Sequence, residues 1–479
     1  MIWIDIRNDE YILEKKYTFD LIFSSIGIEH RFLDIDSKIE NDDLIIYYSP
    51  ELKKKYSNNY IWIKESLNLF NDNYLKLQPN YSVKKIELEE SIKSIKDIIS
   101  IFSQENITYL QEDNGFKMLV DIISDIFFMV TRYEEIICKE KDSHERFQLE
   151  ESIAYKFNFL NRPIVNEQIE LFLSILRKLD EKIEKKNRWL NKEFVFFLSH
   201  DIDSIFKYKD KIIRTIGIKI LREKNIKDSI KLMSNSLKVL LNKKKDPFWT
   251  FDYLATLEEK YSINASYYFM CGGETGKDNY YNINNKNLKN VFKRIKDNSS
   301  EIGVHGSYNS YNNFNLLNKE AEKINEFTNL VGIRQHYLRF KVPDTWNIQA
   351  KCGLKYDTTL GYAKYAGFRG GVCTPYKPFD ILNREVIDIY EIPLIVMDGT
   401  ISEAQYMGLS PNEAIEYVKQ VIDRIIEVNG VFSLLWHNSS LDKNSVWSDW
   451  ITVYEEIIKY SIDKNALAIS GEKIIELYK

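Results

Sequence analysis

The pattern of hydrophobic and polar residues predicts short strands that alternate with amphipathic helices along most of the chain. A short apolar run bounded by polar residues is typical of a strand buried on both faces, whereas apolar residues that recur at helical spacing indicate a helix. In the first part of the chain we expect strands at Ile2–Ile6 and Asp43–Tyr48 and a helix at Tyr11–Ser25. Gly115–Lys139 and Glu167–Lys186 are also expected to be helical.

The second part of the chain repeats this alternation, beginning with the apolar run Phe194–Leu198. Further strands are expected at Ala265–Met270, Glu301–Val304, Ile333–Phe340, Val386–Ile392, Val431–Trp436 and Leu467–Ser470, with helices at Asp252–Tyr261, Leu288–Asn298 and 318–329. Strands separated by helices indicate parallel βα repeats, in a barrel or an open sheet. The polar stretch Asn187–Lys192 is a plausible boundary, which predicts an N-terminal α/β domain at 1–190 and a (β/α) domain at 191–479.

Composition and charge exclude several classes of protein. A chain of 479 residues is long for one domain, and its 44% hydrophobic and 29% charged residues are ordinary for a globular protein. The net charge of −5 gives no general attraction to nucleic acid, so we expect no nucleic-acid partner. The four cysteines lack the spacing of a metal site. Because we see neither a signal-peptide pattern nor a run of roughly 18 apolar residues, we expect a cytoplasmic protein.

One segment, Lys207–Lys245, departs from this composition because it is rich in Lys and Arg and poor in acidic residues. Its apolar residues recur at helical spacing, which predicts helices with a basic face, inserted at about 205–246. The ordinary interpretation is a solvated surface. The alternative is peripheral contact with a membrane surface or with a phosphorylated carrier.

Ionisable side chains directly follow several of the predicted strands. They are Asp201, Asp203, His305, Arg339, Asp398 and His437. Because the carboxyl ends of parallel strands meet at one edge, where α/β enzymes place their active sites, we expect these side chains to converge. The chain has only six His, and three of them, including His200, fall at such strand ends, which chance placement does not readily explain.

This set of side chains suits the metal-assisted hydrolysis of a neutral carbonyl compound. A bound metal polarises the carbonyl and lowers the pKa of its water from roughly 15.7 towards about 7. Asp201 is the expected base for the attacking water, and His437 is the expected acid for the leaving amine. Arg339 is compatible with two interpretations, a partner that keeps a site carboxylate ionised or an ordinary surface ion pair. Asp398, which precedes Gly399, is equally well explained as an ordinary turn residue.

The same residues resemble the motifs of the polysaccharide deacetylase family, also called the NodB-homology or carbohydrate esterase 4 group. Ser199-His200-Asp201-Ile202-Asp203 resembles its first motif, His305-Gly-Ser-Tyr-Asn309 its second, Arg339-x-x-x-Pro343 its third, Asp398 its fourth and Leu435-Trp436-His437 its fifth. The stretches 356–362 and 367–369 resemble a branch that has a separate N-terminal domain and is linked to surface-polysaccharide synthesis.

The resemblance implies a distorted (β/α)7-type barrel with catalytic Asp201, His437, Arg339 and Asp398. It also implies a divalent metal, Zn2+ by default, on Asp203, His305 and Asn309. Asn309 stands where the family usually has a second His, so His336 and His200 are alternative ligands. The implied substrate is an N-acylated sugar, N-acetylated by default, of a surface polysaccharide or of its nucleotide-linked or lipid-linked precursor.

Two other functions are compatible with these motifs. The first is a catalytically silent family member that binds a glycan or a biosynthetic partner, which the Asn at 309 favours. The second is a hydrolase of another C–N bond on the same scaffold, such as a deformylase or a hydrolase of amidines or primary amides. The sequence leaves the oligomeric state open.

Overall fold

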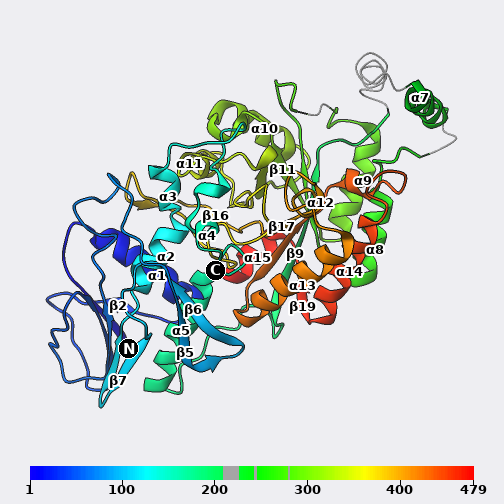
Figure 1. Cartoon of the computed structure of the whole chain (residues 1–479). Coiled ribbons are helices and arrows are strands. Elements are labelled where there is room, and N and C mark those ends of the chain that lie inside the picture. The colour runs from blue at the N-terminus through cyan, green and yellow to red at the C-terminus, as the bar shows by residue number, and fades with distance from the viewer. Residues whose placement is uncertain (209–225, 242–244, 279–280) are drawn as a thin grey trace.

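The computed structural model describes residues 1–208, 226–241, 245–278 and 281–479. The N-terminal part, blue to cyan in Figure 1, lies beside a larger part built from the rest of the chain. The first part holds a six-stranded sheet formed entirely before residue 190, and the second holds a nine-stranded sheet formed entirely after it.

The N-terminal sheet has the order β2-β1-β3-β4-β8-β7. Its strands are β1 (Ile2–Ile6), β2 (Arg31–Phe32), β3 (Leu44–Ser49), β4 (Tyr60–Lys64), β7 (Tyr109–Glu112) and β8 (Gly115–Met118), and β5 (Lys84–Ile92) with β6 (Ile95–Ser100) forms a separate hairpin. Neighbouring strands of the sheet are parallel except for β7 and β8. The helices are α1 (Ile12–Ile26), α2 (Ile122–Val130), α3 (Tyr133–Ile137), α4 (Ile153–Lys156) and α5 (Ile164–Leu179), with a short 3-10 turn η1 (Leu149–Glu151).

The long helix predicted at Gly115–Lys139 is wrong, because the segment forms β8, α2 and α3 instead. The first residues of the segment form β8, which pairs with β4, so their apolar side chains belong to a strand. Asp121 then caps α2 by accepting a hydrogen bond from the Ser124 amide. Arg132 has a left-handed backbone (φ 55°), which ends the helical path before α3 begins.

The second sheet is parallel throughout and curls into an incomplete barrel with the order β16-β13-β12-β11-β10-β9-β18-β17, where β19 also pairs with β9. Its strands are β9 (Phe194–Ile202), β10 (Ser266–Phe269), β11 (Glu301–Gly306), β12 (Gly332–Gln335), β13 (Tyr356–Asp357), β16 (Tyr390–Glu391), β17 (Val396–Met397), β18 (Val431–Leu435) and β19 (Ala466–Ala468). This confirms the predicted α/β class with a distorted parallel barrel. The predicted strand Ile333–Phe340 is shorter than expected and ends at Gln335.

β9 is the central strand, and every one of its residues is buried. On one edge it pairs with β18, where Val195 lies opposite Val431. On the other edge it pairs first with β19, at Phe194, and then with β10, from Ser199 to Ile202. The apolar run in the sequence is therefore the strand around which the barrel is assembled.

Helices flank this sheet on its outside, as α8, α9, α13 and α14 do in Figure 1. The described helices of this part are α7 (Ile226–Leu240), α8 (Phe251–Tyr261), α9 (Lys286–Asp297), α10 (Phe314–Asn325), α11 (Asp344–Lys351), α12 (Asp398–Ser402), α13 (Pro411–Glu427), α14 (Trp450–Asp463) and α15 (Gly471–Tyr478). Three 3-10 turns, η2 (Ser310–Asn312), η3 (His336–Leu338) and η4 (Asn438–Leu441), and a small hairpin of β14 (Phe379–Asp380) with β15 (Glu385–Val386) complete this part. In the predicted basic insertion, α7 is helical, whereas 209–225 and 242–244 lie outside the described residues.

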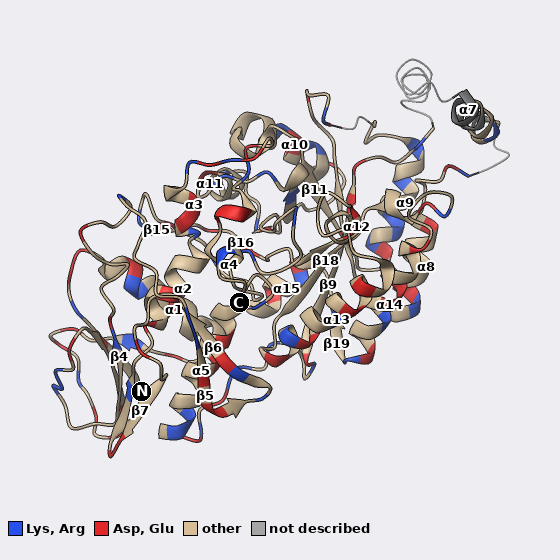
Figure 2. Cartoon of the chain, in the orientation of Figure 1, with Lys and Arg blue, Asp and Glu red and all other residues tan. Residues whose placement is uncertain are grey.

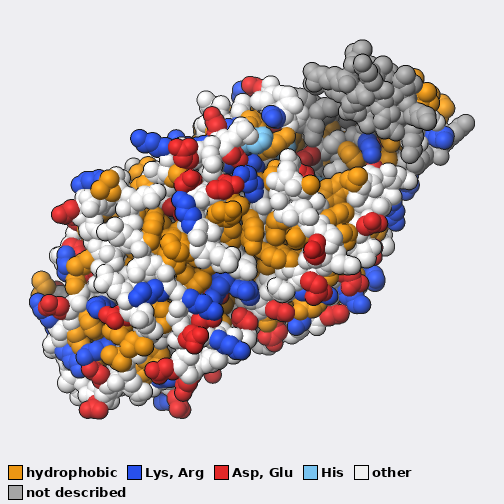
Figure 3. Space-filling view, in the orientation of Figure 1, with side chains coloured by type: hydrophobic (Ala, Val, Ile, Leu, Met, Phe, Trp, Pro, Cys, Tyr) orange, Lys and Arg blue, Asp and Glu red, His pale blue; other side chains and the backbone are white. Residues whose placement is uncertain are grey.

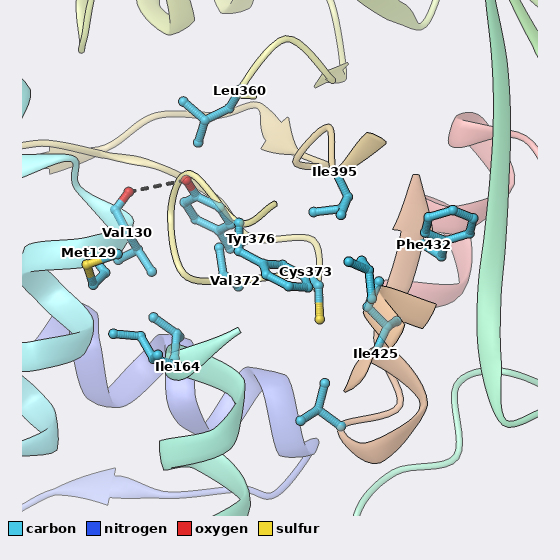
Figure 4. Close-up of a cluster of buried hydrophobic side chains, with 14 of the residues drawn as sticks. Met129, Val130, Ile164, Leu360, Val372, Cys373, Tyr376, Ile395, Ile425 and Phe432 are labelled. Atoms are coloured by element: carbon cyan, nitrogen blue, oxygen red, sulfur yellow. Dashed lines mark hydrogen bonds between the residues drawn. The ribbon is translucent and has the colours of Figure 1, made fainter. Parts of the chain in front are cut away.

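The two parts share one continuous hydrophobic core. Figure 4 shows side chains of α2, α5, the 372–376 loop, α13 and β18 packed in a single cluster, and the Tyr376 hydroxyl donates a hydrogen bond to the Val130 carbonyl (3.2 Å). Buried charges reinforce the same interface, because Glu135 binds both Arg132 and Arg369 through its carboxylate. The Arg132–Glu135 segment is therefore a buried packing face between the two parts.

The surface carries both signs of charge. Figure 2 shows Lys and Arg interspersed with Asp and Glu along the helices, and Figure 3 shows the same mixture on one face, with apolar patches between the charges. Among the helices that the structure describes, none has the length and apolar character needed to cross a membrane.

Candidate active site

A cavity of about 370 Å³ opens at the carboxyl end of the second sheet. Six titratable residues that line it lie at, or just after, the carboxyl ends of five different strands: Asp201, Asp203, His305, His336, Asp398 and His437. Tyr337, Tyr406 and Trp447 provide aromatic walls, and Arg146 reaches the cavity from the N-terminal part. A larger cavity, of about 560 Å³, lies between α8 and α9 outside the sheet and is lined by none of these six residues.

Asp201 and Asp203 leave β9 on the same side, as the alternation of an extended strand predicts. Asp201 Oδ2 lies 3.7 Å from His305 Nδ1, and Asp203 Oδ1 lies 3.2 Å from His305 Nε2. Asp201 is buried, whereas the Asp203 side chain keeps 23% of its surface exposed and reaches the cavity. Both carboxylates therefore share one imidazole neighbour.

Arg334, on β12, is the cation that pairs with Asp201. Its Nη1 donates to Asp201 Oδ1 (3.0 Å) and to the Ser199 hydroxyl (2.9 Å), and its Nε donates to the Thr358 carbonyl. The guanidinium is fully buried and lies 4.9 Å from the centre of the Tyr268 ring. The sequence motifs did not identify Arg334. The available signal was its position just before Gln335 and His336, where the strand ends.

The tautomer of His305 follows from its hydrogen bond. Nδ1 lies 2.9 Å from the Arg334 carbonyl oxygen, which can only accept, so Nδ1 carries the proton. Nε2 is left facing Asp203 Oδ1, and both buried atoms lack an aligned hydrogen-bond partner. Burial disfavours a charged ring, but Asp201 and Asp203 outweigh it and raise the pKa of His305.

His336 follows β12 and completes a group that can hold a cation. One ligand atom each from Asp203, His305 and His336 lies within 4.8 Å of the others. His336 Nδ1 faces Asp278 Oδ1 (3.4 Å), an outer carboxylate of the kind that orients a metal-binding imidazole. Although burial opposes the charge on Asp278, His336 and the Tyr308 amide lower the pKa of that carboxyl to about 2.

His437 and Asp398 form a second pair in the cavity. His437 Nδ1 lies 2.8 Å from Asp398 Oδ1, and the His437 amide donates to Asp398 Oδ2 (2.9 Å). His437 Nε2 lies 3.8 Å from Asp203 Oδ2. Burial disfavours the imidazolium, but Asp398 above all, with Asp203 and Asp201, raises the pKa of His437 to about 10. Asp398 also accepts from the Gly399 amide, so it is both a turn residue and the partner of His437.

Three residues considered from the sequence do not line this cavity. Arg339 contacts Glu145 (2.6 Å) and donates to the Tyr308 carbonyl (2.6 Å) and to Asn309 Oδ1 (3.1 Å). Asn309 itself is exposed and is bound to Arg339. His200 points to the other side of β9, where Nδ1 donates to the Trp436 carbonyl (2.7 Å) and Nε2 lies 3.3 Å from Glu258. The structure therefore brings His336, and neither Asn309 nor His200, to Asp203 and His305.

Residues 4–181 match the model of a family of unknown function (DUF7033), and no curated protein matches the chain. Among solved structures, a probable polysaccharide deacetylase from Pseudomonas aeruginosa PAO1 is 12% identical, with a TM-score of 0.41, over 60% of this chain and 91% of its own. The Puue allantoinase is 12% identical, with a TM-score of 0.40, over 61% and 92%. Agd3, a carbohydrate deacetylase, is 8% identical, with a TM-score of 0.38, over 100% and 86%.

Proposed function

We propose that the protein is a metal-dependent hydrolase that removes an N-acyl group, acetyl by default, from a sugar of a surface polysaccharide or of its precursor. One observation carries the proposal: a single cavity brings together a group suited to a cation, a carboxylate held by Arg334 and an imidazole held by Asp398. A glycan-binding protein without activity needs neither a positioned base nor a positioned acid.

The residues present fit a divalent cation. Asp203, His305 and His336 offer one carboxylate oxygen and two imidazole nitrogens, a donor set that suits Zn2+ and leaves room for further ligands. The two buried atoms without an aligned hydrogen-bond partner, Asp203 Oδ1 and His305 Nε2, face each other. Buried polar atoms are normally satisfied, so their lack of partners supports a bound ion.

In the proposed mechanism, Asp203, His305 and His336 would hold a divalent cation, which would polarise the scissile carbonyl and make water a better nucleophile at neutral pH. Asp201 accepts the proton of the attacking water while Arg334 fixes the position of its carboxylate. His437, protonated through its raised pKa and oriented by Asp398, donates a proton to the departing amine. The proton removed from water is thereby balanced by the proton given to nitrogen.

The walls of the cavity support a sugar as the substrate. Tyr337, Tyr406 and Trp447 line it, and aromatic faces of this kind pack well against the apolar face of a sugar ring. A volume of about 370 Å³ lies at the lower end of the range for small-molecule sites. We further propose that the protein acts in the cytoplasm, on the polysaccharide itself or on a nucleotide-linked or lipid-linked precursor of it.

The test compares purified wild-type protein with Asp201→Asn, both loaded with Zn2+, on a panel of N-acetylated, N-formylated and other N-acylated sugars. We expect the wild type to release the carboxylate, and the variant to keep its metal and fold while losing about 100-fold or more in rate, because a positioned base contributes roughly 10²–10⁴-fold.

Two results would contradict the proposal. A wild-type protein that holds no metal and hydrolyses none of these amides would point instead to a silent glycan-binding protein. A near-normal rate in Asp201→Asn would remove that residue as the base. Primary amides and amidines, assayed beside the sugars, distinguish a hydrolase of another C–N bond.

A further inference from the structure

A short segment of the N-terminal part, residues 142–147, lies against the active site and is called the arm here. It follows α3 and precedes η1, and an isolated bridge between Lys141 and Phe147 closes it into a loop. Within the arm, Asp142 accepts hydrogen bonds from the Arg146 amide (3.0 Å) and from Arg146 Nε (2.8 Å). The arm therefore presents the Arg146 guanidinium in a fixed orientation.

The barrel holds the arm through several polar contacts. Arg339 donates to the His144 carbonyl (2.8 Å) and binds the Glu145 carboxylate (2.6 Å), which also accepts from the Tyr311 hydroxyl (2.8 Å). The His144 ring bonds the Tyr308 hydroxyl through Nδ1 (3.0 Å). Arg339, which the motifs pointed to as a site residue, thus anchors the arm to the barrel.

Arg146 reaches from the arm to the turn that carries His336. It lines the cavity and is 8% exposed, and its Nη1 donates to the Tyr337 carbonyl (2.8 Å). The Tyr337 ring lies between two imidazoles, 4.7 Å from His144 and 4.5 Å from His336. A continuous set of contacts therefore leads from the arm to the third member of the cation-binding group.

The turn after His336 needs such support because its backbone is strained. Tyr337 and Leu338 both have left-handed φ values, of 61° and 52°, which bulky residues rarely adopt. Backbone of this kind is energetically unfavourable and persists only where its surroundings hold it. A hydrogen bond from a buried guanidinium to the Tyr337 carbonyl is one such restraint.

We propose that Arg146 is a positioning residue that fixes the turn at Tyr337, and through it His336, so that the N-terminal part sets the cation affinity of the barrel's active site. This inference rests on the proposed function, because it assumes that His336 is a ligand. It also gives the N-terminal part a function, which is to supply the Arg146 hydrogen bond that restrains the turn at Tyr337.

The test measures zinc affinity by competition with a chelator, on the full chain, for wild type, Arg146→Ala and Arg146→Lys. We expect Arg146→Ala to weaken zinc binding by about tenfold, the lower end of the 10–100-fold cost of losing a direct outer partner, because Arg146 acts on His336 through the neighbouring Tyr337. Arg146→Lys keeps a donor for the Tyr337 carbonyl but loses the planar guanidinium that binds the Asp142 carboxylate, so we expect an intermediate zinc affinity.

Arg188→Ala is the matched control. Arg188 is also 8% exposed and also joins the two parts, since it donates to the Ser25 carbonyl (2.9 Å) and the Tyr478 carbonyl (3.2 Å), but it does not line the cavity. We expect its zinc affinity to equal that of wild type, even where its melting temperature falls. If Arg146→Ala is insoluble, Asp142→Asn loosens the same guanidinium and should weaken zinc binding in the same direction.

The outcomes separate this inference from the proposed function. A wild type that binds zinc and an Arg146→Ala variant that binds it equally well would overturn the role of Arg146 alone. A wild type without zinc affinity would overturn both. A lower melting temperature of the metal-free variant, with unchanged affinity, would show that Arg146 only stabilises the fold.

Discussion

Asp203 meets two imidazoles that come from neighbouring strands rather than from one helical turn. His305 ends β11 and His336 follows β12, so the spacing between these two residues in the chain carries no trace of their proximity. The orientation of His336 depends on Asp278, on the loop before α9, whose carboxylate faces its Nδ1. At the scale of single residues, the pairing of strands in the sheet is therefore what brings Asp203, His305 and His336 together.

This geometry predicts different results for two substitutions. His336→Ala should weaken zinc binding by at least about 100-fold, because loss of a ligand exceeds the 10–100-fold cost of losing an outer partner. Asn309→Ala should leave zinc affinity unchanged, because the Asn309 side chain is exposed and bonds Arg339. Metal content after dialysis and chelator competition measure both, and a loss confined to Asn309→Ala would reverse the assignment.

Which side chains share the cavity was largely predictable, because strand ends of a parallel sheet converge. Asp201, Asp203, His305, Asp398 and His437 all directly follow apolar runs, and the structure places all five around one cavity. The choice of Arg334 over Arg339 as the partner of Asp201 was not predictable. It depends on where β12 stops, and the apolar pattern places strand ends only to within a few residues.

At the scale of elements, Glu301 joins the amino ends of several strands. From the start of β11, its Oε2 accepts hydrogen bonds from Ser266 of β10 (2.7 Å), Tyr356 of β13 (2.8 Å) and the Glu472 amide of α15 (3.1 Å). Its other oxygen, Oε1, is buried without a partner. Burial outweighs these donors and raises the pKa of Glu301 to about 7.

This raised pKa predicts a stability that falls as pH rises. The folded state binds the Glu301 proton more tightly than the unfolded state, so the contribution is complete below pH ~4.5 and is lost as pH rises through about 7. Glu301→Gln imitates the protonated carboxyl, so it should make the free energy of unfolding less dependent on pH. The part removed is roughly 3 kcal/mol for about 2.5 pKa units. Urea unfolding at pH 5 and pH 8 measures it, and identical pH slopes in both proteins would refute it.

The apolar pattern predicted the types of most elements because buried side chains recur at different spacings in strands and in helices. The pattern failed at Gly115–Lys139. This apolar stretch is long enough for one helix, but it contains the strand β8, the helix cap Asp121 and Arg132 with its left-handed backbone. The pairing of β8 with β4 is a long-range contact, and local periodicity carries no information about it.

At the scale of the whole molecule, the two parts are joined by buried charge as well as by the shared core. Glu135 accepts from Arg369 Nε (2.9 Å) and Nη2 (2.6 Å) and from Arg132 Nε (2.8 Å), and all three side chains are at least 98% buried. Burial opposes the charge on Glu135, but the two guanidinium groups lower the pKa of its carboxyl to about 2.

We expect Glu135→Gln to reduce the free energy of unfolding by about 3–5 kcal/mol, because it leaves the buried Arg369 guanidinium without its counter-charge and leaves Arg132 with Glu134 alone. Glu150→Gln is the control, since the Glu150–Lys364 pair also joins the two parts but is about 40% exposed and should contribute roughly 0–1 kcal/mol. Calorimetric unfolding compares them, and equal effects would show that the buried cluster stabilises the interface no more than the exposed pair does.

The three neighbours of β9 have a consequence for biosynthesis. Its first residues pair with β18 and β19, which follow much later in the chain, so during translation the apolar first half of β9 is made long before these two partner strands. Contacts so distant in sequence close slowly, and unpaired apolar edges attract other nascent chains. The order of synthesis thus leaves the apolar first half of β9 without these two partner strands until β18 and β19 have been made.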